Sequence, residues 1–139
     1  MLVLMANLEY RIGELKIDTE KLKFTGEDAQ ETLHKFVVQA ADKTASIYVA
    51  PAGGHVHVAQ HFELDETNIV GGGVLYMDRN ERFVLGGYSG KYKAIPRKAA
   101  EIFAELILPR LEEQGIKPYG VRIATAEHEL HEYWKKLDF

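Results

Sequence analysis

The sequence predicts an α+β fold, in which a β-sheet carries one principal helix after a central hairpin and shorter flanking helices. The hairpin is predicted at residues 69–88, where two apolar runs, IVGGGVLYM and RFVLGGYS, are joined by the polar turn Asp78–Glu81. The principal helix is predicted from Pro96, where the apolar residues change to helical spacing. At 139 residues, of which 46% are hydrophobic, we expect one domain spanning residues 1–139.

The N-terminal part is predicted to contain strands and a short helix. The stretch LEYRIGELKI, within residues 1–24, favours one or two strands. Thr25 is followed three residues later by Asp28, a spacing that resembles a capping box and indicates a short helix near 26–34.

The middle of the chain is predicted to form three more strands. The stretch KFVVQAADKTASIYVAP predicts strands at 35–40 and 44–50, joined by a turn at Ala41–Asp42–Lys43. The stretch HVHVAQHFEL, residues 55–64, alternates at period two and therefore also reads as a strand.

The principal helix has recognisable boundaries. Pro96 suits its first turn, and Gly115 suits its C-terminal cap. Pro109 lies inside the pattern and should kink the helix or end it early. After the helix, YGVRIATA predicts a late strand, and EHELHEYWKKLDF predicts a short terminal helix over residues 127–139.

Composition limits the classes of function. The chain has no cysteine, which excludes disulfides, thiolate metal sites and cysteine nucleophiles, and it fits a cytoplasmic location. The opening MLVLM lacks a basic region and a long apolar region, so no signal peptide is predicted. Without an apolar run of about 18 residues, no membrane partner is expected. The net charge of −4 argues against general nucleic-acid binding.

A local basic segment stands out against this acidic background. Residues 82–100 contain no acid, and they hold five cations, Arg82, Lys91, Lys93, Arg97 and Lys98. Cations at the start of a helix are unfavourable, because the N-terminal end of the helix dipole is already positive. A bound anion would reverse this effect, and the nearby glycines and Ser89 would let it approach the backbone. The alternative is a solvated basic turn whose glycines only permit bends.

Three segments resemble the Janus/Ocnus family, whose best-known members are phosphohistidine phosphatases. KTASIYVAP resembles the family block H-A-D-I-Y, and IVGGGVLYMDRNERFVLGGYSGKY resembles the block L-G-G-G-R-I … V-Y-G-Y-S-x-x-Y-G. AIPRKAAEIFAELILPRLEEQGIKPYGVRI resembles the helix and last strand that follow, so that the resemblance covers about residues 44–123. It implies a mixed β-sheet with helices packed on it, and a phosphate site.

The resemblance also implies the residues of that site. The family's G-x-S loop corresponds to Gly87, Ser89, Gly90 and Lys91. Thr44 stands at the position of the catalytic histidine and is followed by Ala45, so both are expected to contact the ligand. Val74 stands where the family has an arginine; Lys91 or Lys93 could supply the lost charge, without its bidentate geometry. The family's lysine from the first strand has no clear counterpart.

A threonine at position 44 cannot act as the imidazole does, so catalysis would need another group. His55 and His57 are the nearest candidates by strand order, and we predict them as the catalytic residues of an active enzyme. On a strand the two lie on one face, about 6–7 Å apart, which also suits two ligands of one metal ion. His61 lies four residues beyond His57, which would be about 13 Å along a strand.

The sequence therefore predicts a phosphate-binding domain that binds or acts on a phosphorylated small molecule or a phosphoprotein. No cofactor is expected, and no particular oligomeric state is indicated. Two alternatives remain open: a non-enzymatic structural or protein-interaction domain with an inherited fold, and a metal-binding protein that uses the histidine strand.

Overall fold

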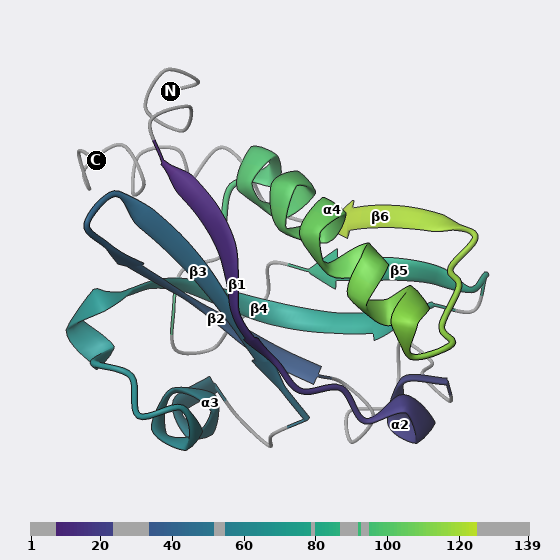
Figure 1. The fold of residues 1–139 in the computed structure, drawn as a ribbon, viewed down its shortest axis with the longest axis horizontal. Coiled ribbons are helices and arrows are strands. Elements are labelled where there is room, and N and C mark those ends of the chain that lie inside the picture. The colour runs from purple at the N-terminus through teal and green to yellow at the C-terminus, as the bar shows by residue number, and fades with distance from the viewer. Residues whose placement is uncertain are drawn as a thin grey trace.

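The protein is a curled six-stranded sheet with helices on both faces (Figure 1). This computed structural model describes residues 8–23, 34–51, 55–78, 80–86, 92 and 95–124, with only the backbone at 55–57. The strands lie in the order β1-β3-β2-β4-β5-β6. Their bounds are β1 Glu9–Leu15, β2 His34–Ala41, β3 Thr44–Ala50, β4 Ile69–Met77, β5 Arg82–Gly86 and β6 Gly120–Ala124.

The sheet is mixed. Both outer pairs, β1 with β3 and β5 with β6, are parallel. The inner pairs, β3 with β2, β2 with β4 and β4 with β5, are antiparallel. The predicted α+β class, with a mixed sheet and one principal helix after the central hairpin, is therefore confirmed.

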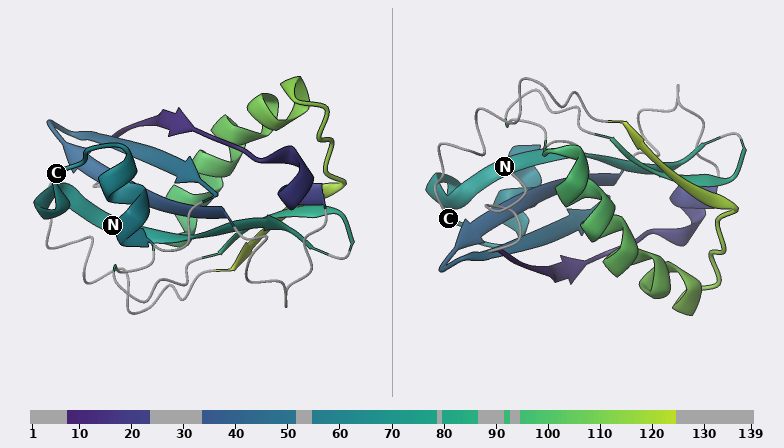
Figure 2. Two further views of the ribbon diagram at one scale, coloured as in Figure 1. Left: turned by 90° about the horizontal axis from the view of Figure 1, so that it is seen from below. Right: turned by 90° about the horizontal axis from the view of Figure 1, so that it is seen from above.

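The principal helix, α4 (Arg97–Glu113), packs on one face of the sheet and contacts both edge strands, β1 and β6. The right-hand view of Figure 2 shows α4 lying between these two strands, which the curl of the sheet brings toward the same helix. Its buried side covers the main core, where Phe103 meets Tyr10 of β1 edge to face at 5.3 Å between ring centroids. Burial raises the pKa of Tyr10 to about 12.

The opposite face of the sheet carries a smaller helix, α3 (His55–His61). The strands serve both faces by alternation: Ala45, Ile47 and Val49 of β3 enter the main core, whereas Tyr48 joins the cluster under α3. That second cluster is built on the buried residues Val37, Val58 and Ile69. The 3-10 helix η2 (Glu66–Asn68) then leads directly into β4.

The predicted turn at Ala41–Asp42–Lys43 is confirmed. Ala41 pairs with Thr44, so the loop between β2 and β3 has two residues. Asp42 and Lys43 both adopt positive φ, 52° and 63°, as a tight type I′ hairpin requires. The left-handed conformation costs an L-residue about 1–2 kcal/mol, and the second position normally carries glycine. The hairpin geometry therefore strains Lys43.

The central hairpin is also confirmed, as β4 and β5 pair antiparallel around a turn that begins at Asp78. Gly73 of β4 lies where two backbones approach closely. A Cβ there would collide with the carbonyl oxygen of Gly86 and the ring of Phe36. At least one glycine of the triple-glycine run is thus required by packing rather than by a ligand.

Helix α4 has the C-terminal cap predicted at Gly115, but it does not end at Pro109. Gly115, with φ 83°, donates its N–H to Glu112, and Ile116 donates to Leu111, both at 3.0 Å, which completes a Schellman motif. Of the two expected effects of Pro109, a kink or an early end, the early end is wrong, because the helix runs four residues past it. Pro109 and Glu105 are both exposed, and water can solvate the carbonyl that the proline leaves without a donor.

The strand predicted at residues 55–64 is wrong, because His55–His61 form helix α3. Val58 and Phe62 are four residues apart, and both pack against the second cluster, so the apolar residues satisfy a helical face as well as period two. A second helix, α2 (Thr19–Lys23), was not predicted. The Asp18 carboxylate caps it by accepting the N–H groups of residues 20 and 21.

Two other predicted helices lie mainly or wholly outside the described residues. Residues 24–33, which hold most of the helix expected near 26–34, are among these, and His34 already belongs to β2. The terminal helix at 127–139 is the other. Within the described part of the chain, no helix has the length and apolar character needed to cross a membrane.

Candidate functional site

The predicted catalytic histidines do not share a strand face. His55 and His57 lie on helix α3 and not on a strand. The 6–7 Å spacing, which favoured two ligands of one metal ion, assumed a strand and therefore does not apply. Among the described residues, no group of three or more His, Cys, Asp or Glu is placed to hold a metal ion.

Most of the predicted phosphate loop lies outside the described residues, namely Gly87, Ser89, Gly90, Lys91 and Lys93. Tyr92 is described, and it packs against the second cluster, on the α3 side of the sheet. Its hydroxyl donates to Glu66 Oε1 at 3.0 Å. Burial and this contact with a carboxylate raise the pKa of Tyr92 to about 12.

The two predicted ligand contacts on β3 point to opposite faces. The Ala45 side chain is fully buried in the main core, where no ligand can reach it. Thr44 lies on the other face, half-buried, and lines a pocket of about 270 Å³. The walls of this pocket, called the Arg11 pocket below, are formed by Arg11, Gln39, Ala41, Asp42, Thr44 and Ser46.

Strand pairing assembles the Arg11 pocket from three segments. Arg11 of β1 is in register with Ser46 of β3, which is also paired with Gln39 of β2. Thr44 lies two residues before Ser46 and shares its face. Asp42 comes from the β2–β3 turn at the same end of the sheet.

One hydrogen bond fixes the centre of the pocket. Arg11 Nε donates to Ser46 Oγ at 2.8 Å. The hydroxyl belongs to a residue only 2% exposed, whereas the arginine is exposed. Because Nε is engaged, the fork of terminal guanidinium nitrogens is oriented yet remains open to a ligand. Gln39 Oε1 accepts a long bond of 3.4 Å from the Tyr48 hydroxyl, which leaves the amide N–H₂ of Gln39 available as a donor.

This arrangement suits binding of an oxyanion better than covalent chemistry. Arginine offers planar, bidentate donation to phosphate, and the two hydroxyls and the Gln39 amide add further donors. Of the described residues that line the pocket, only Asp42 could serve as a base, and none is an imidazole or lysine that could activate Thr44 or Ser46. Arg11 and Ser46 were not predicted as site residues. The sequence signal for them is their period-two position in the stretches LEYRIGEL and TASIYVA.

A second cavity, of about 450 Å³, lies between α4 and β6, and Arg97, Glu101, Val121 and Arg122 are among the residues that line it. The cations at the start of α4 have local partners here. Arg97 lies 3.6 Å from Glu101 and donates to the Ile123 carbonyl at 3.1 Å, and Lys98 lies 3.9 Å from Glu101. These contacts with acidic and carbonyl oxygens offset the unfavourable dipole interaction of Arg97 and Lys98, whereas Lys91 and Lys93 lie outside the described residues.

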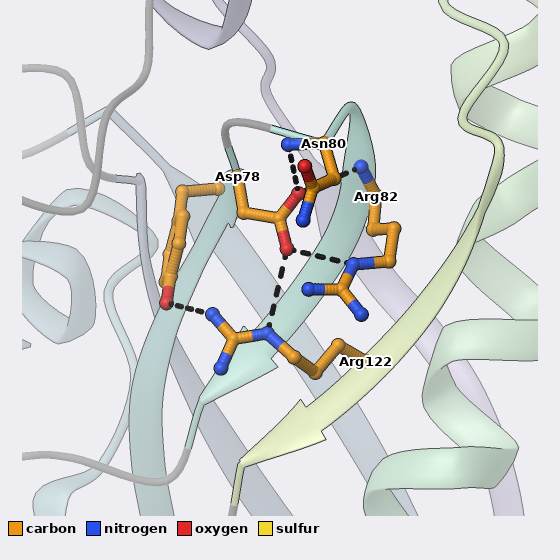
Figure 3. A network of polar contacts seen from close by, with 5 residues as sticks. Asp78, Asn80, Arg82 and Arg122 are labelled. Carbon is orange, nitrogen blue, oxygen red and sulfur yellow. Dashed lines mark hydrogen bonds and ion pairs between the residues drawn. The ribbon is translucent and has the colours of Figure 1, made fainter.

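A buried carboxylate holds the turn of the central hairpin (Figure 3). Asp78, only 5% exposed, accepts the backbone N–H groups of Asn80 at 2.9 Å and Arg82 at 3.0 Å. Its other oxygen lies 2.9 Å from Arg82 Nε and 3.5 Å from Arg122 Nε, and Arg122 also donates to the Tyr76 hydroxyl at 2.9 Å. Burial alone would raise the pKa of Asp78, but these hydrogen bonds and the arginine charge hold it below its usual value.

Comparison with known proteins assigns neither a family nor a function to the chain. No protein-family model matches the chain, and neither a curated protein nor a solved structure matches it.

Proposed function

We propose that the chain is a phosphate-binding domain of Janus/Ocnus type, whose ligand is a phosphorylated small molecule or a phosphorylated side chain. The observation that carries the proposal is the Arg11 pocket. In it, a guanidinium oriented by Ser46 and the Thr44 hydroxyl line one hollow.

The position of Thr44 links the pocket to the sequence resemblance. Thr44 stands where the family carries its catalytic histidine, and the family also uses a cation from its first strand. Arg11 lies on β1, the first described strand, and it lines the same pocket as Thr44. Arg11 can therefore take the role of the first-strand lysine, with a bidentate geometry that lysine lacks.

The proposed activity is binding rather than phosphoryl transfer. Thr44 is a poor nucleophile at neutral pH unless a base takes its proton. His55 and His57, which were predicted to supply that base, lie on a helix and not on a strand beside β3. Loss of the catalytic histidine would leave a site that still recognises phosphate.

Calorimetric titration with inorganic phosphate at fixed ionic strength tests this proposal. We expect wild-type protein to bind phosphate and Arg11→Gln to lose at least about tenfold in affinity, since one charge-assisted bidentate contact contributes more than a neutral hydrogen bond. Arg110→Gln, which removes an exposed arginine from the last turn of α4, is the matched control and should bind as wild type does. Equal affinities for wild type and Arg11→Gln would refute the Arg11 pocket as the phosphate site.

A further inference from the structure

We propose that the Arg11 pocket is selective for a phosphorylated amine, a ligand with a phosphate at one end and a cationic ammonium at the other. This inference rests on the proposed phosphate binding and adds the class of ligand. It follows from the charges that the pocket brings together.

Asp42 is the first of these charges. It lines the same pocket as Arg11, and the two-residue turn fixes its backbone at φ 52°. In a site for simple phosphate this carboxylate would repel the ligand. A ligand that also carries a cationic group would turn this repulsion into an attraction.

Glu9 places a second carboxylate at the same end. It is in register with Thr44, and it lies two residues before Arg11 on the same face of β1. Asp42 thus lines one end of the pocket with Glu9 on the strand beside it, and the Arg11 guanidinium, bonded to Ser46, lies at the other end.

The opposite charges do not neutralise one another. Among the described residues, Arg11 forms no ion pair with Asp42 or Glu9, and its one hydrogen bond is to Ser46. Asp42 has no side-chain hydrogen bond or ion pair with any residue in the described part of the chain. Both charges are therefore available to a ligand at once.

The spacing fits a short molecule. Thr44 and Ser46 are two residues apart along β3, and the turn lies just beyond Thr44, which places the cationic and anionic ends roughly 7–10 Å apart. A phosphate held by Arg11 and Ser46 and an ammonium two carbons away can bridge this span. A pocket of about 270 Å³ holds a molecule of that size.

The test compares two probes of equal length, O-phosphoethanolamine and ethyl phosphate, which differ by the ammonium group. We expect wild type to bind O-phosphoethanolamine more tightly, by about fivefold or more, because an ammonium–carboxylate contact at about 4 Å contributes that factor even in water. Asp42→Asn should weaken O-phosphoethanolamine, strengthen ethyl phosphate and so remove the preference. Asparagine tolerates positive φ, so this variant keeps the turn.

The outcomes separate this inference from the proposed function. Glu113→Gln, an exposed acid at the end of α4, is the control and should keep the wild-type preference. If both probes bind and need Arg11, but their affinity ratio is the same in wild type and Asp42→Asn, selectivity for an amine is refuted and phosphate binding stands. If neither probe nor inorganic phosphate binds wild type, both proposals are refuted.

Discussion

Replacing Asp78 by asparagine keeps the shape of the side chain but removes its charge. One amide oxygen can still accept the two backbone N–H groups of the turn. The other position becomes an N–H₂ group that faces Arg82 Nε at 2.9 Å and Arg122 Nε at 3.5 Å, so donors oppose donors. We expect Asp78→Asn to destabilise the fold.

The expected loss of stability in Asp78→Asn lies between the contribution of an exposed ion pair and that of a buried one. The Asp78 side chain is 3% exposed, but the Arg82 and Arg122 side chains are 42% and 33% exposed, so solvent screens the arginine charges. A loss of about 1–3 kcal/mol in the free energy of unfolding follows. For a chain of this length that corresponds to a fall in Tm of roughly 3–10 °C.

The pH dependence provides a sharper test than the size of the loss. Asp78 has a lowered pKa in the folded state, so its contribution is fully present above its unfolded value of about 3.9 and is lost as the pH falls toward the folded value. The free energies of unfolding of wild type and Asp78→Asn, measured by denaturant titration, should differ at pH 7 and begin to converge below about pH 4. Glu81→Gln, an exposed change in the same turn, should stay within about 0.5 kcal/mol of wild type. If the difference in free energy of unfolding between wild type and Asp78→Asn stays constant from pH 7 to pH 3, the stabilisation does not come from the Asp78 charge.

Three further predictions concern packing, turn geometry and catalysis. Gly73→Ala should lower the free energy of unfolding by about 3 kcal/mol, the upper end of the usual range for overpacking, because the added Cβ would collide with backbone. Gly120→Ala should change it little, because a Cβ there would meet no other part of the fold within 4 Å, and similar losses in the two variants would contradict the packing argument. Lys43→Gly should raise stability by up to about 1 kcal/mol by relieving its positive φ, and a lower Tm would count against this. Wild type, His55→Ala and His57→Ala should all fail to hydrolyse phosphohistidine; turnover by wild type that either substitution abolishes would restore a catalytic role.

Local signals in the sequence were sufficient for the elements around the hairpin. The polar turn at Asp78–Glu81, the two-residue turn at Asp42–Lys43 and the Gly115 cap each express a backbone requirement within a few residues. They could be predicted because the physical cause and the sequence signal lie in the same short stretch.

The candidate site could not be predicted in this way. Arg11 and Ser46 are 35 residues apart and meet only because β1 pairs with β3, a parallel partnership that no local pattern specifies. The strand predicted from the period-two pattern of HVHVAQHFEL was wrong for another reason. Val58 and Phe62 also fit one face of a helix, and tertiary packing selects the helix over the strand.

The placement of α4 between β1 and β6 has a consequence for the order in which the fold is acquired. Tyr10 packs on Phe103, so the first described strand shares a core with a helix far along the chain. Hairpins such as β2–β3 can close early, whereas β1 gains its helix only after α4 has emerged. During synthesis, the apolar side of β1 stays uncovered until α4 has emerged, and apolar surface exposed in this way favours aggregation.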